Sequence, residues 1–315
     1  MSIDDHNDLT SQPDKVNKPG LKSAMRFYIV VFVLLIIFGS IAQGLHFEFG
    51  MLFTQWVIIL LPALWLLRRY GVDRASFSRL KTLPLHFVPV IILLSLSTWL
   101  INVFVATGLV TALMQFGYEP LVVIEPPQTF QQYLFLLLVI AFSAGVCEEV
   151  LFRGTIMPAL EESGPIPAIV FSSLLFALFH VSFTNLFSTF FLGAVIAVVV
   201  IKTGSLWGGI LYHILNNFYA VTYLYILGNQ ETAAEVEPYV LWGLLPILIL
   251  GLVATYFSLR WLQNKSGREP LLRSWKGNLM PAGWFGGLIV IGFIIFLVMA
   301  LLEFAIGFGW FDLGI

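Results

Sequence analysis

Three short polar clusters lie inside otherwise apolar stretches of this 315-residue chain. Glu148 and Glu149 begin the first cluster, His180 ends the second, and His213 and Asn217 form the third. Ionisable side chains are costly inside a membrane, so they usually face a partner, a cavity or a reaction. Two carboxylates, two imidazoles and a carboxamide are the side chains of a hydrolytic site.

Two mechanisms fit this set of side chains. A carboxylate beside a histidine can take a proton from water and make the water a nucleophile, while a second histidine and an asparagine amide stabilise the oxyanion that forms. Alternatively, Glu148, His180 and His213 are a ligand set for catalytic zinc, with water as the fourth ligand. The sequence has no His-Glu-x-x-His segment, the commonest zinc arrangement. The cofactor therefore stays open between zinc and a metal-free glutamate mechanism.

The spacing of the clusters indicates which side chains can meet. Glu148 precedes Gly164 by 16 residues and His180 follows Gly164 by 16. Two antiparallel helices pass the same depth at equal distances from their turn, so we expect Glu148 and His180 to meet. For His213 to join them, the hairpin must protrude into the cytoplasm by roughly two turns of helix.

Each cluster also has an interpretation without chemistry. Glu149 and Arg153 are four residues apart and can form an ion pair on one helix face. His213 and Asn217 have the same spacing and can serve as polar contacts between helices. His180 alone can be a structural histidine. The single cysteine, Cys147, adjoins the acids, and we expect it to be structural because burial beside acids disfavours a thiolate.

The elements that position these residues are membrane helices. The chain is 59% hydrophobic and 11% charged, against about 25% charged residues in soluble domains. Helices satisfy their own backbone hydrogen bonds in lipid, so we predict an all-α, polytopic membrane helical bundle in the lipid bilayer. The net charge of −2 gives no indication of a nucleic-acid partner. We predict nine spans at about 27–45, 49–67, 87–114, 131–157, 166–183, 185–201, 205–227, 239–259 and 283–305.

Charge sets the predicted orientation and the domain boundaries. All 16 Lys and Arg residues fall on one side of the nine-span arrangement, so the N-terminus is predicted to be cytoplasmic and the C-terminus outside. We divide the chain into a disordered cytoplasmic tail (1–25), an N-terminal transmembrane scaffold (26–130), a catalytic transmembrane core (131–227) and a C-terminal transmembrane scaffold (228–315).

In this order, Glu-Glu-x-x-x-Arg, Phe-x-x-x-His and His-x-x-x-Asn resemble the motifs of the CPBP family, which comprises the CAAX endopeptidases and bacteriocin-processing enzymes and is also called the Abi family. The motifs cover about residues 145–220. The resemblance implies an intramembrane endopeptidase with an eight-helix core that opens toward the cytoplasm, here with one extra C-terminal span. It implies a peptide or lipidated-protein substrate.

The resemblance also implies a role for each residue. Glu148 would activate water, Glu149 and Arg153 would complete that motif, His180 would be the partner base, and His213 with Asn217 would bind the oxyanion. Two other functions fit the sequence: a non-catalytic membrane immunity or regulatory protein, which keeps the polar cluster for structure, and a small-solute transporter that uses the acids as ion sites. A transporter built from duplicated halves should show internal repeats, and we find none.

Overall fold

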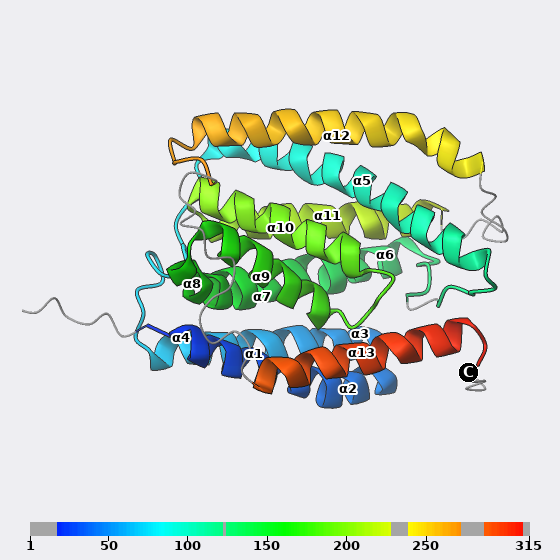
Figure 1. The fold of residues 1–315 in the computed structure, drawn as a ribbon, viewed down its shortest axis with the longest axis horizontal. Helices are drawn as coiled ribbons and strands as arrows, with labels where there is room; N and C mark the ends of the chain where they lie inside the picture. The colour runs from blue at the N-terminus through cyan, green and yellow to red at the C-terminus, as the bar shows by residue number, and fades with distance from the viewer. Residues whose placement is uncertain (1–17, 122–123, 228–238, 272–286, 311–315) are drawn as a thin grey trace, which may run out of the picture.

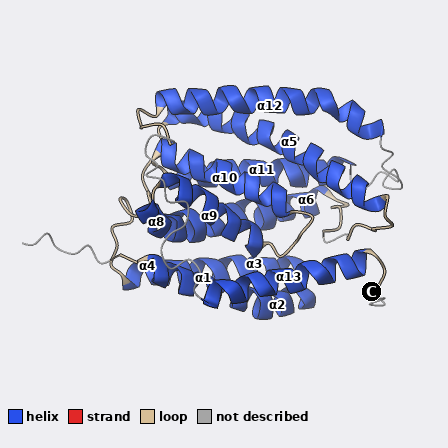
Figure 2. Ribbon diagram, viewed as in Figure 1, coloured by secondary structure: helices blue, strands red, loops and turns tan. Residues whose placement is uncertain are grey.

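The computed structural model describes residues 18–121, 124–227, 239–271 and 287–310. Within these ranges the chain consists of helices and loops without a strand, as Figure 2 shows. This confirms the predicted all-α bundle. Seven of the described helices are long and apolar enough to cross a membrane, so the chain is a multi-pass membrane protein and the number nine stays a prediction.

The N-terminal half forms three long helical rods. The first joins α1 (Leu21–Leu34), the π-helical segment η1 (Leu35–Gly39) and α2 (Ser40–Leu45). The second joins α3 (Phe47–Phe53), η2 (Thr54–Leu60) and α4 (Leu61–Arg69). The third is η3 (Leu85–Phe87) with α5 (Val88–Met114). Since α1 begins at Leu21, the helix starts before the predicted end of the tail at residue 25. Residues 1–17 lie outside the described ranges.

The first motif lies on one long irregular rod. Its segments are α6 (Phe130–Leu136), η4 (Leu137–Ser143), α7 (Ala144–Leu151), η5 (Phe152–Ile156), α8 (Met157–Leu160) and η6 (Glu161–Ser163). Thr129 caps its start, because the Thr129 hydroxyl accepts from Gln132 N–H and the Gln132 side chain reaches back to the cap. Gly164, at φ 106°, makes the turn into α9 (Pro165–Phe179).

The remaining helices are α10 (Leu186–Thr203), α11 (Leu206–Leu227), α12 (Tyr239–Lys265) and α13 (Gly287–Gly307). The predicted break near residues 182–185 is confirmed, but α9 has only 15 residues, about 22 Å, and ends at Phe179 rather than at the predicted 183. The α9–α10 hairpin therefore turns back before it reaches the far ends of α5 and α13 (Figure 1). The basic residues at 273 and 276, which are among the 16 that set the predicted orientation, fall outside the described ranges.

The core surrounds α7 and α9. Its buried side chains come from α1, α4, α5, α7, α9, α10 and α11, and they include Phe32, Ile91, Leu151, Phe176 and Tyr212. Two ends of the bundle are distinct in charge: α4 ends with Arg68 and Arg69, and α10 and α12 end at the same side near Lys202 and Lys265 (Figure 1). The opposite end carries the 115–121 segment and the end of α13.

Candidate active site

Two consecutive acids lie on α7, an eight-residue helix between two π-helical segments, η4 and η5. Each π-helical insertion changes the direction in which the following side chains point, and such insertions are frequent at functional sites. Within α7, Glu148 and Glu149 are rotated from each other by about 100°, so they face different neighbours. Glu149 points into the protein, whereas Glu148 borders a cavity. The two acids have different environments, as the sequence allowed.

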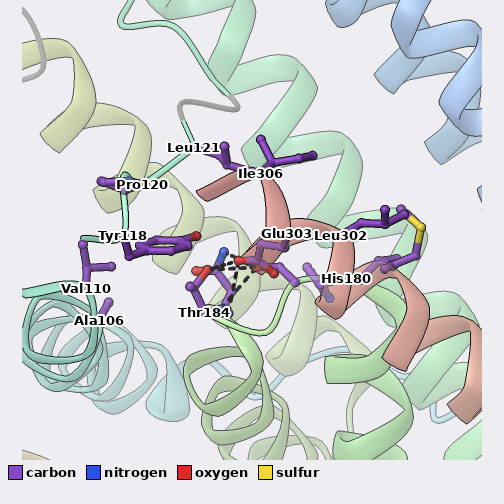
Figure 3. A pocket seen from close by; sticks show the side chains of 14 residues that line it. Ala106, Val110, Tyr118, Pro120, Leu121, His180, Thr184, Leu302, Glu303 and Ile306 are labelled. Atoms are coloured by element: carbon purple, nitrogen blue, oxygen red, sulfur yellow. Dashed lines mark hydrogen bonds between the residues drawn. The ribbon is translucent and has the colours of Figure 1, made fainter. Parts of the chain in front are cut away.

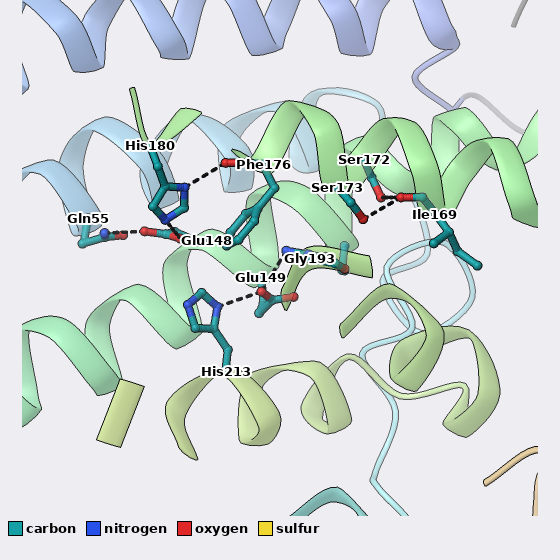
Figure 4. Close-up of polar contacts among 11 residues, drawn as sticks. Gln55, Glu148, Glu149, Ile169, Ser172, Ser173, Phe176, His180, Gly193 and His213 are labelled. Carbon is teal, nitrogen blue, oxygen red and sulfur yellow. Dashed lines mark hydrogen bonds and ion pairs between the residues drawn. The ribbon is translucent and has the colours of Figure 1, made fainter. Parts of the chain in front are cut away.

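Glu148 keeps one oxygen free of protein partners. Its Oε1 accepts a hydrogen bond of 2.7 Å from the Gln55 amide on η2, as Figure 4 shows. Its Oε2 lies 3.9 Å from His180 Nε2, and among the described residues it has no hydrogen-bond partner although the side chain is 6% exposed. The predicted meeting of Glu148 and His180 is confirmed. At 3.9 Å the two atoms are too far apart for a direct hydrogen bond, a separation that a water molecule can bridge.

His180 has a defined orientation and tautomer. It lies directly after the last residue of α9, and its Nδ1 is 2.8 Å from the Phe176 carbonyl oxygen one turn earlier. A carbonyl oxygen only accepts, so Nδ1 carries the hydrogen and Nε2 presents a lone pair to Glu148 when the ring is neutral. His180 Nε2 is therefore suited to accept a hydrogen bond from a water molecule, and so orient it, or to receive a proton.

On the core side of this pair, three buried side chains are bonded to one another. Glu149 Oε1 accepts from Arg153 Nη1 and from His213 Nδ1, both at 2.9 Å. Arg153 Nη2 also donates to the Gly193 carbonyl at 2.9 Å. Glu149 and Arg153 are 0% exposed and His213 is 2% exposed. The predicted Glu149–Arg153 ion pair is confirmed, and it supplies the countercharge that a carboxylate in the core requires.

The Phe176 ring connects the two histidines and the arginine. The Arg153 guanidinium lies 4.6 Å from its centroid, and the rings of His180 and His213 lie at 4.7 and 5.7 Å. The first residue of the Phe-x-x-x-His motif thus contacts all three through its ring and accepts from His180 through its carbonyl. The motif was visible in the sequence, but this role of Phe176 was not assigned.

Asn217 and His213 each form a hydrogen bond to another group of the protein. The Asn217 amide donates to the Ile140 carbonyl in η4 at 2.9 Å, while His213 is bonded to Glu149. Neither residue is among those that line the cavity next to Glu148. The two residues share a helix face, as predicted, and their oxyanion role stays a prediction.

The conditional zinc set does not come together in this arrangement. Within the described ranges, no group of three His, Cys, Asp or Glu side chains is placed to hold a metal ion. Glu148 and His180 are neighbours, whereas His213 is bonded to Glu149 through Nδ1, a bond that a metal-binding histidine also makes with its second nitrogen. The choice between zinc and a metal-free mechanism stays a prediction, and the chemistry below uses the side chains alone.

Two cavities meet at His180. A cavity of about 260 Å³ is bordered by polar residues, among them Gln55, Glu148 and His180, and by a similar number of apolar residues. A larger cavity of about 790 Å³, shown in Figure 3, is bordered by His180, Tyr118 and Glu303, and by apolar residues of α5 and α13. The resemblance implies a core that opens toward the cytoplasm, the side predicted for the basic end. Of the two site histidines, only His180 borders these two cavities, and the lining of the larger one lies toward the opposite end.

Gln55 and Glu303 were missed in the sequence analysis, which assigned their helices to scaffold. Each is a polar side chain in an apolar span, and that signal was available for both. Gln55 is 3% exposed and reaches Glu148. Cys147 is buried in the core among apolar side chains, which agrees with a structural residue.

The chain is a multi-pass helical membrane protein in which a glutamate and a histidine from different helices meet beside a cavity. Residues 130–219 match the family model described as type II CAAX prenyl endopeptidase Rce1-like. This match confirms the resemblance to the CPBP and CAAX family and contains all three motifs. It supports a CAAX-type intramembrane protease in general terms, with a lipid bilayer and a peptide as its partners. No curated protein and no solved structure matches the chain.

Proposed function

We propose that this protein is an intramembrane endopeptidase of the CAAX protease or bacteriocin-processing type, which hydrolyses a peptide bond of a membrane-associated substrate. The observation that supports this proposal best is the pair of Glu148 Oε2 and His180 Nε2, 3.9 Å apart at the edge of a cavity. This separation accommodates a water molecule that contacts both groups.

In the proposed mechanism Glu148 is the general base. Water held between Glu148 Oε2 and His180 Nε2 loses a proton to the carboxylate as its oxygen attacks the carbonyl carbon of the scissile bond. Protonated Glu148 then gives that proton to the leaving amine. The Gln55 amide holds the other oxygen of Glu148, which fixes the direction of the free oxygen. His180 orients the water, and its own ring is fixed through the Phe176 carbonyl.

The site is stabilised from its core side by the side chains of Glu149, Arg153 and His213. Their side chains are bonded to one another, so they form a rigid support for the site rather than a second reaction centre. An oxyanion role for His213 would use Nε2, because Nδ1 is bonded to Glu149, and Asn217 would use the second hydrogen of its amide, because the first is donated to Ile140. Glu148 and His180 are therefore the residues on which the proposal depends.

The experiment compares protein termini in membranes that contain the wild-type protein, Glu148→Gln, or no protein. New termini should appear only with the wild type, because Gln keeps the size of the side chain but cannot take the proton. We expect the Glu148→Gln variant to insert and fold, and its cleavage rate to fall by about 10²-fold or more. Glu162→Gln, at an exposed acid that pairs with Lys18, is the matched control and should cleave normally.

Cleavage at a near-normal rate by Glu148→Gln would contradict the assignment of the base. If wild-type and empty membranes have the same termini, the alternative of a non-catalytic immunity or regulatory protein gains support.

A further inference from the structure

Glu303 is an acid inside the apolar helix α13, and its carboxylate binds the loop that follows His180. Its Oε2 accepts from the Phe183 backbone N–H at 2.6 Å, and its Oε1 accepts from the Thr184 backbone N–H at 3.3 Å. The Thr184 and Ser182 hydroxyls also donate to Oε1, at 2.5 and 3.2 Å. Figure 3 shows these bonds at the wall of the larger cavity. The carboxylate charge is thus matched by four donors from one loop.

The loop needs such a partner because its backbone is strained. His180 ends α9, and the next residue, Val181, has φ 54°, in the left-handed region. Glycine usually occupies this position after a helix, and a β-branched residue there is a genuine outlier. Strained backbone of this kind persists only where the surroundings hold it in place, and it gathers at functional sites. The surroundings here are the bonds from Glu303 to the next three residues.

The helix that carries Glu303 is itself anchored at two residues that follow Glu303. The Phe304 ring lies 4.9 Å from the Phe183 ring of the loop. At the end of α13, the Gly307 carbonyl accepts from the Glu119 N–H at 2.7 Å, and a Cβ at Gly307 would lie 2.0 Å from the Tyr118 ring. Only glycine permits this approach. The Glu303 carboxylate is therefore held at a fixed position relative to the loop.

The position of His180 depends on this loop. The side chain of His180 is partly exposed, with its ring between the two cavities. Inside α9 only Phe176 fixes its orientation, by one hydrogen bond and one ring contact. On the other side its backbone continues directly into Val181 and the clamped residues. A shift of the loop would change the 3.9 Å separation between His180 Nε2 and Glu148 Oε2.

We infer that Glu303 is a positioning residue, which clamps residues 182–184 and thereby holds His180 against Glu148. This rests on the proposed function for its consequence in catalysis, but the clamp itself can be tested without cleavage. It makes α13, which lies outside the matched residues 130–219, a part of the active site. The C-terminal helix would then be required for turnover and not only for insertion.

The test replaces Glu303 by Gln and by Asp. Gln offers one acceptor oxygen and sets an NH₂ donor against the donors of the loop, whereas Asp keeps both acceptors on a shorter side chain. The first measurement is the rate at which diethyl pyrocarbonate modifies His180 in membranes, relative to exposed His86, by mass spectrometry of the peptides. We expect this ratio to rise several-fold in Glu303→Gln and less in Glu303→Asp.

The second measurement is cleavage of the substrate found by comparison of termini. We expect kcat to fall about tenfold or more in Glu303→Gln with a smaller change in KM, because a displaced catalytic group affects the chemical step. Glu303→Asp should recover part of kcat. Glu162→Gln is the matched control for both measurements and should leave them unchanged. If Glu303→Gln does not accumulate, Ser182→Ala with Thr184→Val removes two of the four donors and keeps the acid.

A folded Glu303→Gln variant with unchanged modification of His180 and unchanged kcat would overturn the inference. A protein that cleaves nothing would contradict the proposed function, while the modification ratio would still support or overturn the clamp. The two failures are therefore distinguishable.

Discussion

At the scale of single residues, two adjacent glutamates have different surroundings. Glu149 is bonded to Arg153 and His213, and its charge is neutralised within the core. Glu148 has one fixed and one free oxygen at a cavity wall. Removal of one partner of a buried ion pair costs about 3–5 kcal/mol, so loss of activity in Glu149 or Arg153 variants reports folding as well as chemistry. Substitutions of Glu148 distinguish an effect on chemistry from an effect on folding better, because Glu148 is not part of this ion pair.

Gln55 offers a direct test of how Glu148 is oriented. Gln55→Leu removes the amide that donates to Glu148 Oε1, and a hydrogen bond to a charged group contributes about 1.5–3 kcal/mol. We expect the cleavage rate to fall about 10- to 100-fold in protein that still folds, with a thermal midpoint lowered by about a few degrees because Glu148 loses its hydrogen-bond partner. Gln43→Leu is the matched control, since Gln43 borders the same cavity but donates to Thr54. Equal rates for Gln55→Leu and wild type would show that the amide does not orient the base.

Much of the candidate site could be predicted from the sequence at this scale. The ion pair of Glu149 with Arg153 follows from their spacing of four, and the contact of Glu148 with His180 follows from their equal distances to Gly164. Gln55 could not be placed opposite Glu148, because contacts between distant helices depend on their rotation. A single amide in an apolar span does not indicate which distant residue it contacts.

At the scale of elements, π-helical segments determine which way the site residues point. Segments η2, η4 and η5 interrupt the helices that carry Gln55 and the two acids. The Trp56 indole donates to Ser143 Oγ at 3.0 Å, which joins η2 to η4 just before the acids. An ideal helix rotates each residue by about 100°, and sequence reasoning used that value. Apolar periodicity carries no signal for an inserted residue, so these segments could not be predicted.

The packing of α7 against α11 depends on Gly145. A Cβ at Gly145 would lie 2.5 Å from Ile214 Cγ1 and 3.1 Å from the Ile214 nitrogen, next to His213. Gly145→Ala should push α11 away and lengthen the contact from His213 to Glu149. We expect a loss of about 1–3 kcal/mol in unfolding free energy, measured by thermal unfolding in detergent, and reduced cleavage. Gly243→Ala in α12 is the control, because nothing lies within 4 Å of its Cβ position. Equal stability of the two variants would contradict this account.

At the scale of the whole molecule, the charge distribution and the cavities point to opposite ends. Basic residues of α4, α10 and α12 lie at one end of the bundle, which the positive-inside rule assigns to the cytoplasm. The larger cavity is bordered by residues from 106 to 121 and from 299 to 306, toward the other end. The sequence predicted the order of the described helices, and the number of nine spans stays a prediction. The sequence did not predict this cavity, since α9 is shorter than its apolar run suggested.

Access to the site can therefore be assigned to one side of the membrane by cysteine labelling in a Cys147→Ala background. Asn185→Cys lies at the larger cavity, and Ser76→Cys lies in the exposed loop at the basic end. With a membrane-impermeant maleimide, we expect Asn185→Cys to react in intact cells and Ser76→Cys to react only in inside-out vesicles. Each reaction reports which compartment reaches that side chain, because the reagent does not cross the bilayer.

The four patterns of labelling have different consequences. If both positions react only from the cytoplasmic side, the large cavity opens toward the basic end and our view of access is wrong, although the contact of Glu148 with His180 is unaffected. If Asn185→Cys reacts only in inside-out vesicles and Ser76→Cys reacts in intact cells, the predicted orientation is wrong, while the cavity still lies opposite the basic end. If both positions react only from outside, neither the orientation nor the placement of the cavity survives. The expected pattern requires substrate to reach His180 from the non-cytoplasmic side or from within the bilayer, and it restricts substrates to segments present there.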